Sequence, residues 1–411
     1  MEDCPIGFDE WYHVIQFLSN ADLFRWIQCN SICKTLAQRE LTTRKWIKNG
    51  LFLTIQTGDL FGVRYLVENV GANVHALNDR ALRNASRNGH LQVVRYLVEV
   101  GGADVHADHE EALQWACTNG DLEIVRYLVE KGANVHARND WALREASRNG
   151  HLELVRFLVE KGGADAHECD EAALRAASWF GHLAIVRYLV EKCGAHVHAL
   201  NEDAVQFASR NGQLEVVKYL VEECGADVHA WNECALGLAS MNGHLEMVRY
   251  LVEKCDADLH SLNEQALIRA SSKGHVQIVK YLVEKGADVH AYHEEALRYA
   301  SDDGHLEIVR YLVEECGADV HAWNECALRW TCRNGHVQLV QYLVEKCDAN
   351  VHARNEWALH LASMNGHLDV IRYLVEVGGA NVHAGRDFAL RAANRYGHLE
   401  VVKYLESKGT T

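Results

Sequence analysis

Histidine and cysteine are the residues of this sequence whose number and spacing could support chemistry. The chain has 25 histidines and 13 cysteines among 411 residues. Imidazole and thiolate groups are common zinc ligands, and either can act in catalysis when a neighbouring base or charge activates it. Most of the histidines recur in register: nine follow a glycine, and eleven lie in Val-His-Ala turns or their variants.

This register argues against a metal site. One histidine per repeat places like side chains about 8–10 Å apart, the packing distance of neighbouring helices. The donors of a zinc site instead lie about 2 Å from the ion. Even at His196 and His198, the closest pair, we expect structural, hydrogen-bonding histidines. The sequence therefore predicts no metal and no cofactor.

The cysteines support no active site either. Cys29 and Cys33 have no second pair of metal ligands nearby. Five other cysteines share one place in the repeat, where no neighbouring base would activate them: Cys193, Cys224, Cys255, Cys316 and Cys347. No Ser-His-Asp set, glycine-rich phosphate loop or carboxylate pair interrupts the periodicity. We therefore expect no catalytic residue and no enzyme activity. An odd cysteine count without a secretory signal indicates a reduced, intracellular, cytoplasmic setting.

The elements that carry these residues form a long repeat. Its period is 30 or 31 residues, marked by one glycine in each copy: Gly58, Gly89, Gly120, Gly150, Gly181, Gly212, Gly243, Gly274, Gly304, Gly335, Gly366 and Gly397. A period of this size indicates a solenoid, in which each unit buries its apolar face against its neighbours. The sequence thus predicts an all-α array of about twelve helix pairs over residues 51–411, with atypical first and last units acting as caps.

One copy, residues 199–229, predicts a turn, a helix over 202–210, a break at Asn211-Gly212 and a second helix over 214–222. The residue two places after the turn alanine is usually Asn or Asp, and we expect it to cap the first helix. The next residue is always acidic and would oppose the helix dipole. Six arginines, Arg329 among them, follow this acid by four residues, which predicts helical ion pairs.

The pattern Ala-Leu-Arg-x-Ala-Ser-x-Asn-Gly-His-Leu-Glu-Ile-Val-Arg-Tyr-Leu-Val-Glu-Lys-Gly-Ala-Asp-Val-His-Ala resembles the ankyrin repeat over residues 51–409. It lacks the family's Thr-Pro, and its turns are about three residues shorter than the usual period of about 33 implies. The resemblance implies a protein-binding rod with stunted hairpin fingers. The style of the array is similar to ankyrin arrays encoded by giant DNA viruses, which would place the protein in a host cell.

The first fifty residues do not follow the repeat and predict three short helices. Their spacing of apolar residues resembles an F-box, carried by Pro5, Ile15, Leu18, Leu23, Cys33 and Leu36. The resemblance implies docking of residues 1–50 on the Skp-type adaptor of a cullin–RING ubiquitin ligase. The alternative is a helical cap that only shields the first repeat, which leaves a pure ankyrin scaffold.

The first helices vary from copy to copy along one face, at one, four, eight and eleven places after the turn alanine. Aromatic residues gather there and predict a target-binding stripe: Trp115, Trp141, Trp179, Phe207, Trp231, Tyr292, Tyr299, Trp323, Trp330, Trp357 and Phe388. The same face carries five arginines without an acid four places earlier: Arg87, Arg148, Arg210, Arg333 and Arg395.

Charge and hydropathy narrow the classes of partner. The net charge of −16 argues against nucleic-acid binding through these arginines, although that class remains the third alternative. The sequence contains no run of 18 apolar residues and therefore predicts no membrane span. We expect a monomer that binds protein targets through the array.

Overall fold

The computed structural model describes residues 44–409, with side chains from Gly50 onward, as twelve consecutive helix pairs. The chain divides into two compact units between His196 and Val197. The helices of the first unit are α4 (Arg44–Thr57), α5 (Leu60–Glu68), α6 (Ala76–Arg87), α7 (Leu91–Glu99), α8 (Ala107–Asn119), α9 (Leu122–Glu130), α10 (Ala137–Arg148), α11 (Leu152–Glu160), α12 (Glu168–Phe180) and α13 (Leu183–Cys193).

The second unit continues the same alternation. Its helices are α14 (Ala199–Arg210), α15 (Leu214–Lys218) with the π-turn η1 (Tyr219–Glu223), α16 (Ala230–Asn242), α17 (Leu245–Lys254), α18 (Gln265–Ser272), α19 (Val276–Glu284), α20 (Ala291–Asp302), α21 (Leu306–Arg310) with η2 (Tyr311–Glu315), α22 (Ala322–Asn334), α23 (Val337–Cys347), α24 (Ala353–Asn365), α25 (Leu368–Glu376), α26 (Ala384–Tyr396) and α27 (Leu399–Gly409).

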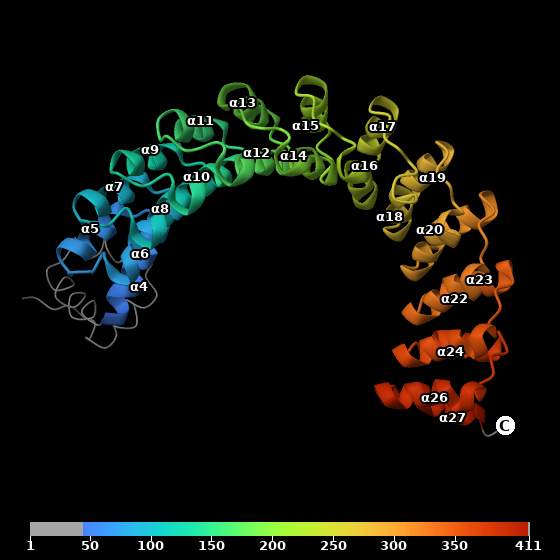
Figure 1. Ribbon diagram of the computed structural model, residues 1–411. Helices are drawn as coiled ribbons and strands as arrows, with labels where there is room; N and C mark the ends of the chain where they lie inside the picture. Colours follow the sequence, from blue (N-terminus) through green and yellow to red (C-terminus); the bar gives the residue numbers. More distant parts are fainter. Residues whose placement is uncertain (1–43, 410–411) are drawn as a thin grey trace, which may run out of the picture. The chain divides into compact units, whose positions relative to one another are not determined.

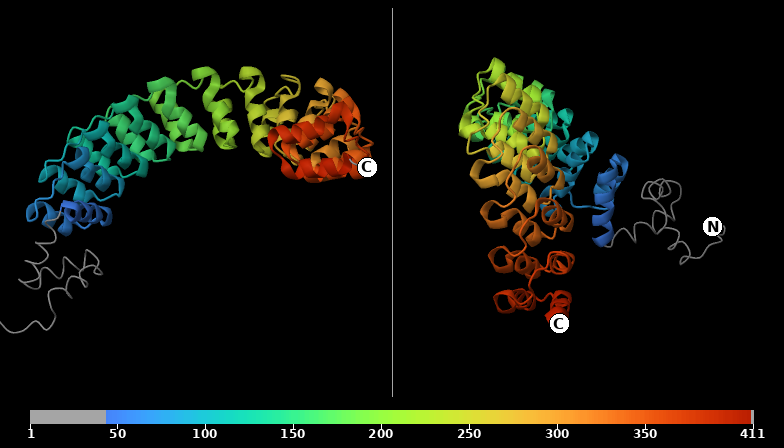
Figure 2. Two further views of the ribbon diagram at one scale, coloured as in Figure 1. Left: turned by 90° about the horizontal axis from the view of Figure 1, so that it is seen from below. Right: turned by 90° about the vertical axis from the view of Figure 1, so that its right-hand side faces the viewer.

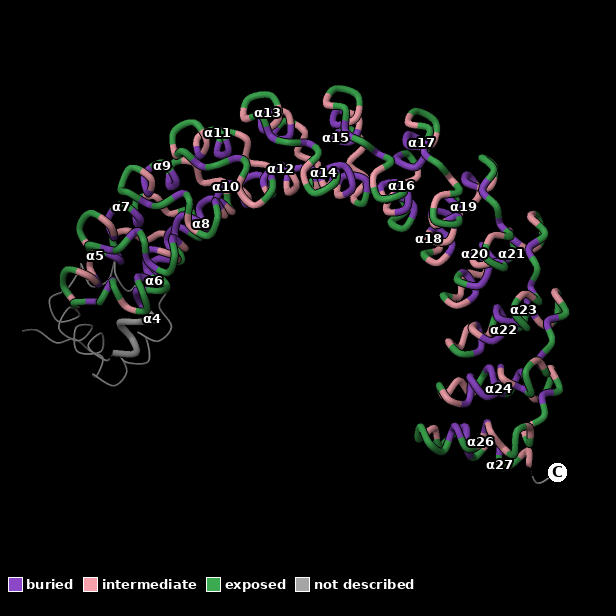
Figure 3. Tube along the Cα trace, in the orientation of Figure 1, coloured by how far each residue is buried: buried purple, intermediate pink, exposed green. Residues whose placement is uncertain are grey.

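Each unit consists of two helical layers. Within each unit the even-numbered first helices of the pairs pack side by side, as α20, α22, α24 and α26 do in the second unit (Figure 1). The second helices form the other layer, and the views in Figure 2 show the same separation of layers. The buried segments face the partner layer, while exposed segments lie on the outer sides and in the turns (Figure 3).

The core follows directly from the repeated residues. In one pair, Ala235, Leu236 and Ala239 of α16 and Val248 and Leu251 of α17 are buried to 2% exposure or less. The two alanines lack bulk beyond Cβ, so neighbouring helices approach closely, and the larger residues fill the space between layers. Truncating one of these buried leucines to alanine would cost about 2–5 kcal/mol.

The start of every first helix from α6 onward differs from the prediction. The three residues after the turn alanine adopt left-handed backbone in succession, as in Trp323, Asn324 and Glu325 with φ of 54°, 55° and 61°. The asparagine therefore lies inside a left-handed turn and does not cap the helix, so the N-cap prediction was wrong. Left-handed backbone costs about 1–2 kcal/mol for each such residue, and this cost requires compensation nearby.

Hydrogen bonds around this turn supply the compensation. His321 Nδ1 lies 2.7 Å from Glu325 Oε1, and the backbone N–H of His321 donates to Asp319 Oδ1 at 2.9 Å. Arg329 donates to the carbonyl oxygens of Trp323 and Asn324 at 2.8 and 2.9 Å. Glu325 therefore pairs with His321, and Arg329 stabilises the turn by bonding to its carbonyl oxygens. The predicted ion pair between Arg329 and the acid is thus replaced by two separate sets of bonds.

Side chains also tie neighbouring repeats together. The hydroxyl of Tyr281 donates to Glu253 Oε1 at 3.1 Å, and His275 Nε2 lies 3.0 Å from the carbonyl oxygen of Met241. Equivalent histidine bonds occur after nine repeat glycines, at His90, His151, His182, His244, His275, His305, His336, His367 and His398. The prediction of structural, hydrogen-bonding histidines is confirmed at these positions.

Between residues 44 and 409 the turns contain no strand, in agreement with the expected shortened fingers. No helix within that range is long and apolar enough to cross a membrane. The F-box-like residues Pro5, Ile15, Leu18, Leu23, Cys33 and Leu36 lie outside the described residues. Helix α4 starts at Arg44, so it runs across residue 50, and it packs against α5 and α6.

Candidate functional site

The predicted stripe lies on the first helices and on the left-handed turns that precede them. The most exposed aromatic residues occupy the first left-handed position: Trp231, Tyr292 and Trp323 are 63%, 57% and 55% exposed. Their backbone is fixed by the hydrogen bonds of the turn, as Arg298 donates to the carbonyl oxygen of Tyr292 at 3.0 Å. These rings therefore project from rigid positions although they lie outside regular helix.

A cluster of rings joins α20 to α22. The guanidinium of Arg298 lies over two rings, 4.6 Å from the centroid of Trp323 and 5.6 Å from that of Trp330. Tyr299 lies 5.8 Å from Trp330 and His293 lies 5.8 Å from Trp323. Arg298 is only 5% exposed, so its charge is held within the cluster and orients both indole rings.

A second cluster joins α24 to α26. The imidazole of His360 stacks on Phe388 with centroids 3.8 Å apart and ring planes 6° apart. Trp357 lies 4.8 Å from His360 and 5.8 Å from Phe388, and Arg391 lies over the Phe388 ring. Burial lowers the pKa of His360, which favours a neutral imidazole in this stack. The two clusters lie on four consecutive first helices.

We call this region the aromatic surface and define it by Tyr292, Tyr299, Trp323, Trp330, Trp357 and Phe388. Its helices α22, α24 and α26 carry six arginines: Arg329, Arg333, Arg354, Arg386, Arg391 and Arg395. The three acids on these helices, Glu325, Glu356 and Asp387, each pair with the histidine of the preceding turn. Helix α20 instead carries Glu294, Glu295 and Asp302 beside Arg298, so the basic part of the aromatic surface is confined to α22, α24 and α26.

The other predicted residues do not join this surface. Trp115 donates to Glu111 Oε1 at 3.1 Å and lies beneath Arg87, whose guanidinium is 4.2 Å from the ring centroid. Arg148 lies over Phe180, which neighbours Trp179. The remaining members lie on other first helices or turns: Trp141 on α10, Phe207 and Arg210 on α14, and Trp231 at the start of α16.

A family model for ankyrin repeats matches residues 51–139, 138–201, 174–261, 205–293, 236–324, 297–386 and 328–411. The chain belongs to the ankyrin-repeat family. Ankyrin repeats are protein–protein interaction scaffolds and are generally not enzymes. No curated protein matches this ankyrin chain. The fold predicted from the sequence, an all-helical ankyrin array, is therefore confirmed.

Sequence reasoning missed three residues that organise the ankyrin array's aromatic surface. Arg298, His360 and Arg391 share the place seven residues after the turn alanine, which points toward the neighbouring first helix. The prediction assigned the two arginines to helical ion pairs and did not consider His360. A usable signal was present: a polar residue recurs at this place in most repeats although the residue before it is always Leu or Val.

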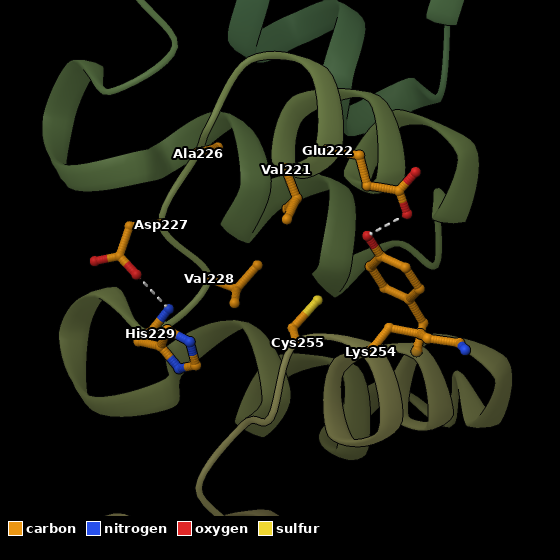
Figure 4. Close-up of a pocket in the computed structure, with 9 residues that line it drawn as sticks. Val221, Glu222, Ala226, Asp227, Val228, His229, Lys254 and Cys255 are labelled. Carbon is orange, nitrogen blue, oxygen red and sulfur yellow. Dashed lines mark hydrogen bonds between the residues drawn. The ribbon is translucent and has the colours of Figure 1, made fainter.

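A shallow pocket of about 230 Å³ lies elsewhere in the array, between the turn at residues 226–229 and α17 (Figure 4). Its polar groups are already engaged. Tyr250 donates to Glu222 at 2.9 Å, and Asp227 accepts from the backbone N–H of His229. Burial raises the pKa of the Cys255 thiol, so the pocket holds no activated nucleophile. The aromatic surface is the stronger candidate site.

Proposed function

We propose that this ankyrin chain is a non-enzymatic scaffold whose aromatic surface binds an acidic segment of a protein partner. The observation that carries the proposal is the pair of ring and guanidinium clusters on four consecutive first helices, one joining α20 to α22 and one joining α24 to α26, formed by residues that vary between repeats. Residues that hold the repeats together are nearly constant, so this departure from the repeat calls for a separate explanation.

The physical properties of the surface suit protein recognition. Tryptophan, tyrosine and arginine dominate binding energy in protein interfaces, because they supply large contact area and directional polar groups. Trp323 and Trp330 are held by Arg298 before any partner arrives, which lowers the entropy lost on binding. A ring that is both exposed and held in this way is suited to serve as an anchor.

Charge specifies the class of partner. All three acids on α22, α24 and α26 are paired with histidines, whereas Arg333, Arg354 and Arg395 are exposed. Carboxylates of a partner can bind these guanidinium groups through paired, charge-assisted hydrogen bonds. We therefore expect apolar residues of the partner to lie against the indole rings and its acidic residues to lie beside the arginines.

The test selects peptides from a displayed library on the full chain and measures their affinities for variants. We expect enrichment of acidic peptides that contain aromatic or aliphatic residues. The double variant Trp323→Ala with Trp330→Ala should weaken binding about tenfold or more, which corresponds to about 1.4 kcal/mol. Trp231→Ala is the matched control, because Trp231 occupies the first left-handed position, as Trp323 does, and is also more than half exposed, but lies outside the aromatic surface.

Two results would contradict the proposal. One is enrichment of peptides without acidic character. The other is equal affinity for the wild type and for the variant that lacks both indole rings. Circular dichroism of each variant would establish that the array stays folded, since Trp323 and Trp330 are not part of the fully buried core.

We further propose that the F-box-like residues 4–48 recruit a Skp-type adaptor, so that the bound partner becomes a substrate of a cullin–RING ubiquitin ligase. The support is the resemblance of Pro5, Ile15, Leu18, Leu23, Cys33 and Leu36 to that family. Co-purification of the adaptor with the intact chain tests this proposal. The alternative, in which these residues only cap the ankyrin array, predicts no adaptor.

A further inference from the structure

One inter-repeat turn, which begins at the end of the first unit, departs from all the others between residues 44 and 409. In ten turns, the residue two places before the turn histidine is Asp or Asn, and its side-chain oxygen accepts from the histidine backbone N–H at 2.9–3.0 Å. In the eleventh turn this residue is His196. Histidine lacks the short side-chain oxygen that this turn uses, so the substitution gives up a recurrent local hydrogen bond.

The replacement brings a second imidazole to a buried carboxylate. His167 Nδ1 lies 2.7 Å from Glu171 Oε1, and the backbone N–H of His196 donates to the same oxygen at 3.1 Å. The rings of His167 and His196 have centroids 5.4 Å apart. One potential ligand atom from each of the three side chains lies within 4.8 Å of the other two.

Burial differs between the carboxylate and the two imidazoles. The side chain of Glu171 is 3% exposed, whereas that of His167 is 44% exposed and His196 is also exposed. Glu171 Oε2 is buried without a hydrogen-bond partner. Seven other turn glutamates share such an unpartnered oxygen, but within the described residues only Glu171 is joined by two histidines in this way.

We propose that His167, Glu171 and His196 bind one divalent transition-metal ion of the zinc type. Two imidazoles and one carboxylate are a known ligand set for zinc, with water in the fourth position. The buried carboxylate would form the floor of the site, and the two exposed imidazoles would close on an ion that arrives from solvent. This site shares no residue with the aromatic surface and does not depend on the function proposed for it.

The geometry requires only small adjustment. Ligand atoms of a tetrahedral zinc site lie about 3.3 Å apart. The present separations of up to 4.8 Å therefore close by about 1.5 Å or less, which a rotation of an exposed imidazole can provide. Binding requires neutral histidine, so the ion competes with the proton at His167. Regular spacing of like histidines argued against metal, but His167 and His196 occupy different places in the repeat.

The fourth position is assigned to water, because the ligand atoms that lie within 4.8 Å of one another belong to His167, Glu171 and His196 and do not include the Cys193 sulfur. The ion would join the turns on either side of the α12–α13 pair. We therefore expect it to stabilise this pair and not to catalyse a reaction.

The test measures zinc binding by the full metal-free chain without any histidine tag, using equilibrium dialysis and the absorption spectrum of Co²⁺ as a probe. His196→Asp restores the residue type found in the other turns, and His167→Asn removes the second imidazole. We expect each variant to lose one bound equivalent. His106→Asn is the matched control, because His106 pairs with Glu110 in the same manner but has no second imidazole.

A gain-of-site variant sharpens the test. Near the pocket drawn in Figure 4, His229 Nδ1 lies 2.7 Å from Glu233 Oε1 and the backbone N–H of Asp258 donates to the same oxygen at 3.2 Å. Asp258→His should therefore add one equivalent of zinc. The proposal is overturned if His196→Asp binds as much metal as the wild type. It is also overturned if His106→Asn loses as much as His167→Asn, or if Asp258→His adds none.

Discussion

The histidine–acid pair of each inter-repeat turn is the residue-scale feature that supports the unusual backbone. Hydrogen bonding to the buried carboxylate raises the pKa of His106, His229, His290 and His321. Burial of these imidazoles acts in the opposite direction but is outweighed. Because folding raises the pKa, each charged pair stabilises the fold below the unfolded value of about 6.5. This stabilisation is lost as pH rises through the folded pKa.

Glu110→Gln tests this linkage at one turn. The variant keeps an acceptor for His106 but removes the charge that raises the pKa of His106. Because the imidazole is about half exposed, we expect a cost of only ~0.5 kcal/mol at pH 5.5 and a smaller cost at pH 8. Urea unfolding of the wild type and the variant at the two pH values measures the difference. A cost that grows with pH would contradict the assignment.

The sequence predicted the structural role of the histidines but not the left-handed turn that they support. Leucine, tryptophan and arginine occupy the first left-handed place at Leu77, Trp323 and Arg354, and none of these residue types favours such backbone. The conformation is fixed by bonds from residues up to six places away, such as the bond from Arg329 to the Trp323 carbonyl oxygen. Local preference therefore could not reveal it.

The glycine between the two helices is the main determinant at the scale of the helix pair. Gly120 ends α8 with φ of 80°, and the imidazole of His151 from the next repeat lies against it. A Cβ on Gly120 would lie 2.5 Å from His151 Nδ1. The glycine is therefore required both for its backbone conformation and for the close approach of the next repeat.

Gly120→Ala and Gly163→Ala separate these two requirements. Gly163 has φ of 75° with no neighbouring atom within 4 Å of an added Cβ, so its replacement should cost about 1–2 kcal/mol for the backbone alone. Gly120→Ala should cost more, because the His151 ring must move and its bond to the Thr118 carbonyl oxygen, 3.2 Å away, would break. Urea denaturation of both variants provides the comparison. Equal costs would show that the ring contact is unimportant.

Helix pairs were predictable because glycine breaks and apolar stripes act locally. The predicted break at Asn211-Gly212 lies between α14 and α15, and the predicted second helix over 214–222 corresponds to α15 and η1. The predicted cap was wrong because asparagine accepts left-handed backbone as readily as it caps a helix. Only the bonds formed across the turn decide between these two roles.

At the scale of the whole molecule, each of the two compact units is built from repeats that pack on their neighbours, and the first described helix already belongs to this arrangement. Helix α4 packs against α5 and α6 in the way that α6 packs against α7 and α8. A deletion intended to remove only the F-box-like module should therefore end at residue 43. Removing residues up to 48 would cut into α4 and confuse docking with capping.

Deletion of residues 1–43 distinguishes the adaptor proposal from the cap alternative. If the module recruits a Skp-type adaptor, the truncated chain should lose co-purification of that adaptor and keep its melting temperature within a few degrees. If the module is a cap, the truncated chain should aggregate or melt earlier, because the face of the first repeat is exposed. The docking proposal would be refuted if the intact, folded chain bound no adaptor.

The number of repeats could be read from the sequence, but the clustering of aromatic residues could not be fully predicted. Tyr299 and Trp330 lie one period apart, as do Trp357 and Phe388, so their contacts follow from the register. The stacking of His360 on Phe388 does not follow from the register, because the two residues occupy different places in the repeat. Such contacts depend on how neighbouring first helices pack.

The ties between repeats also have a genetic consequence. The Tyr–Glu bond spans 28 residues at Tyr250, Tyr281 and Tyr342, and the carbonyl bond of the glycine-linked histidines spans 33 or 34. The junctions that carry these bonds are therefore chemically nearly the same as one another. Unequal recombination that removes or duplicates one period would join a repeat to a neighbour it already fits. The array can thus change in length within a lineage and expose new combinations of aromatic rings without requiring new contacts between repeats.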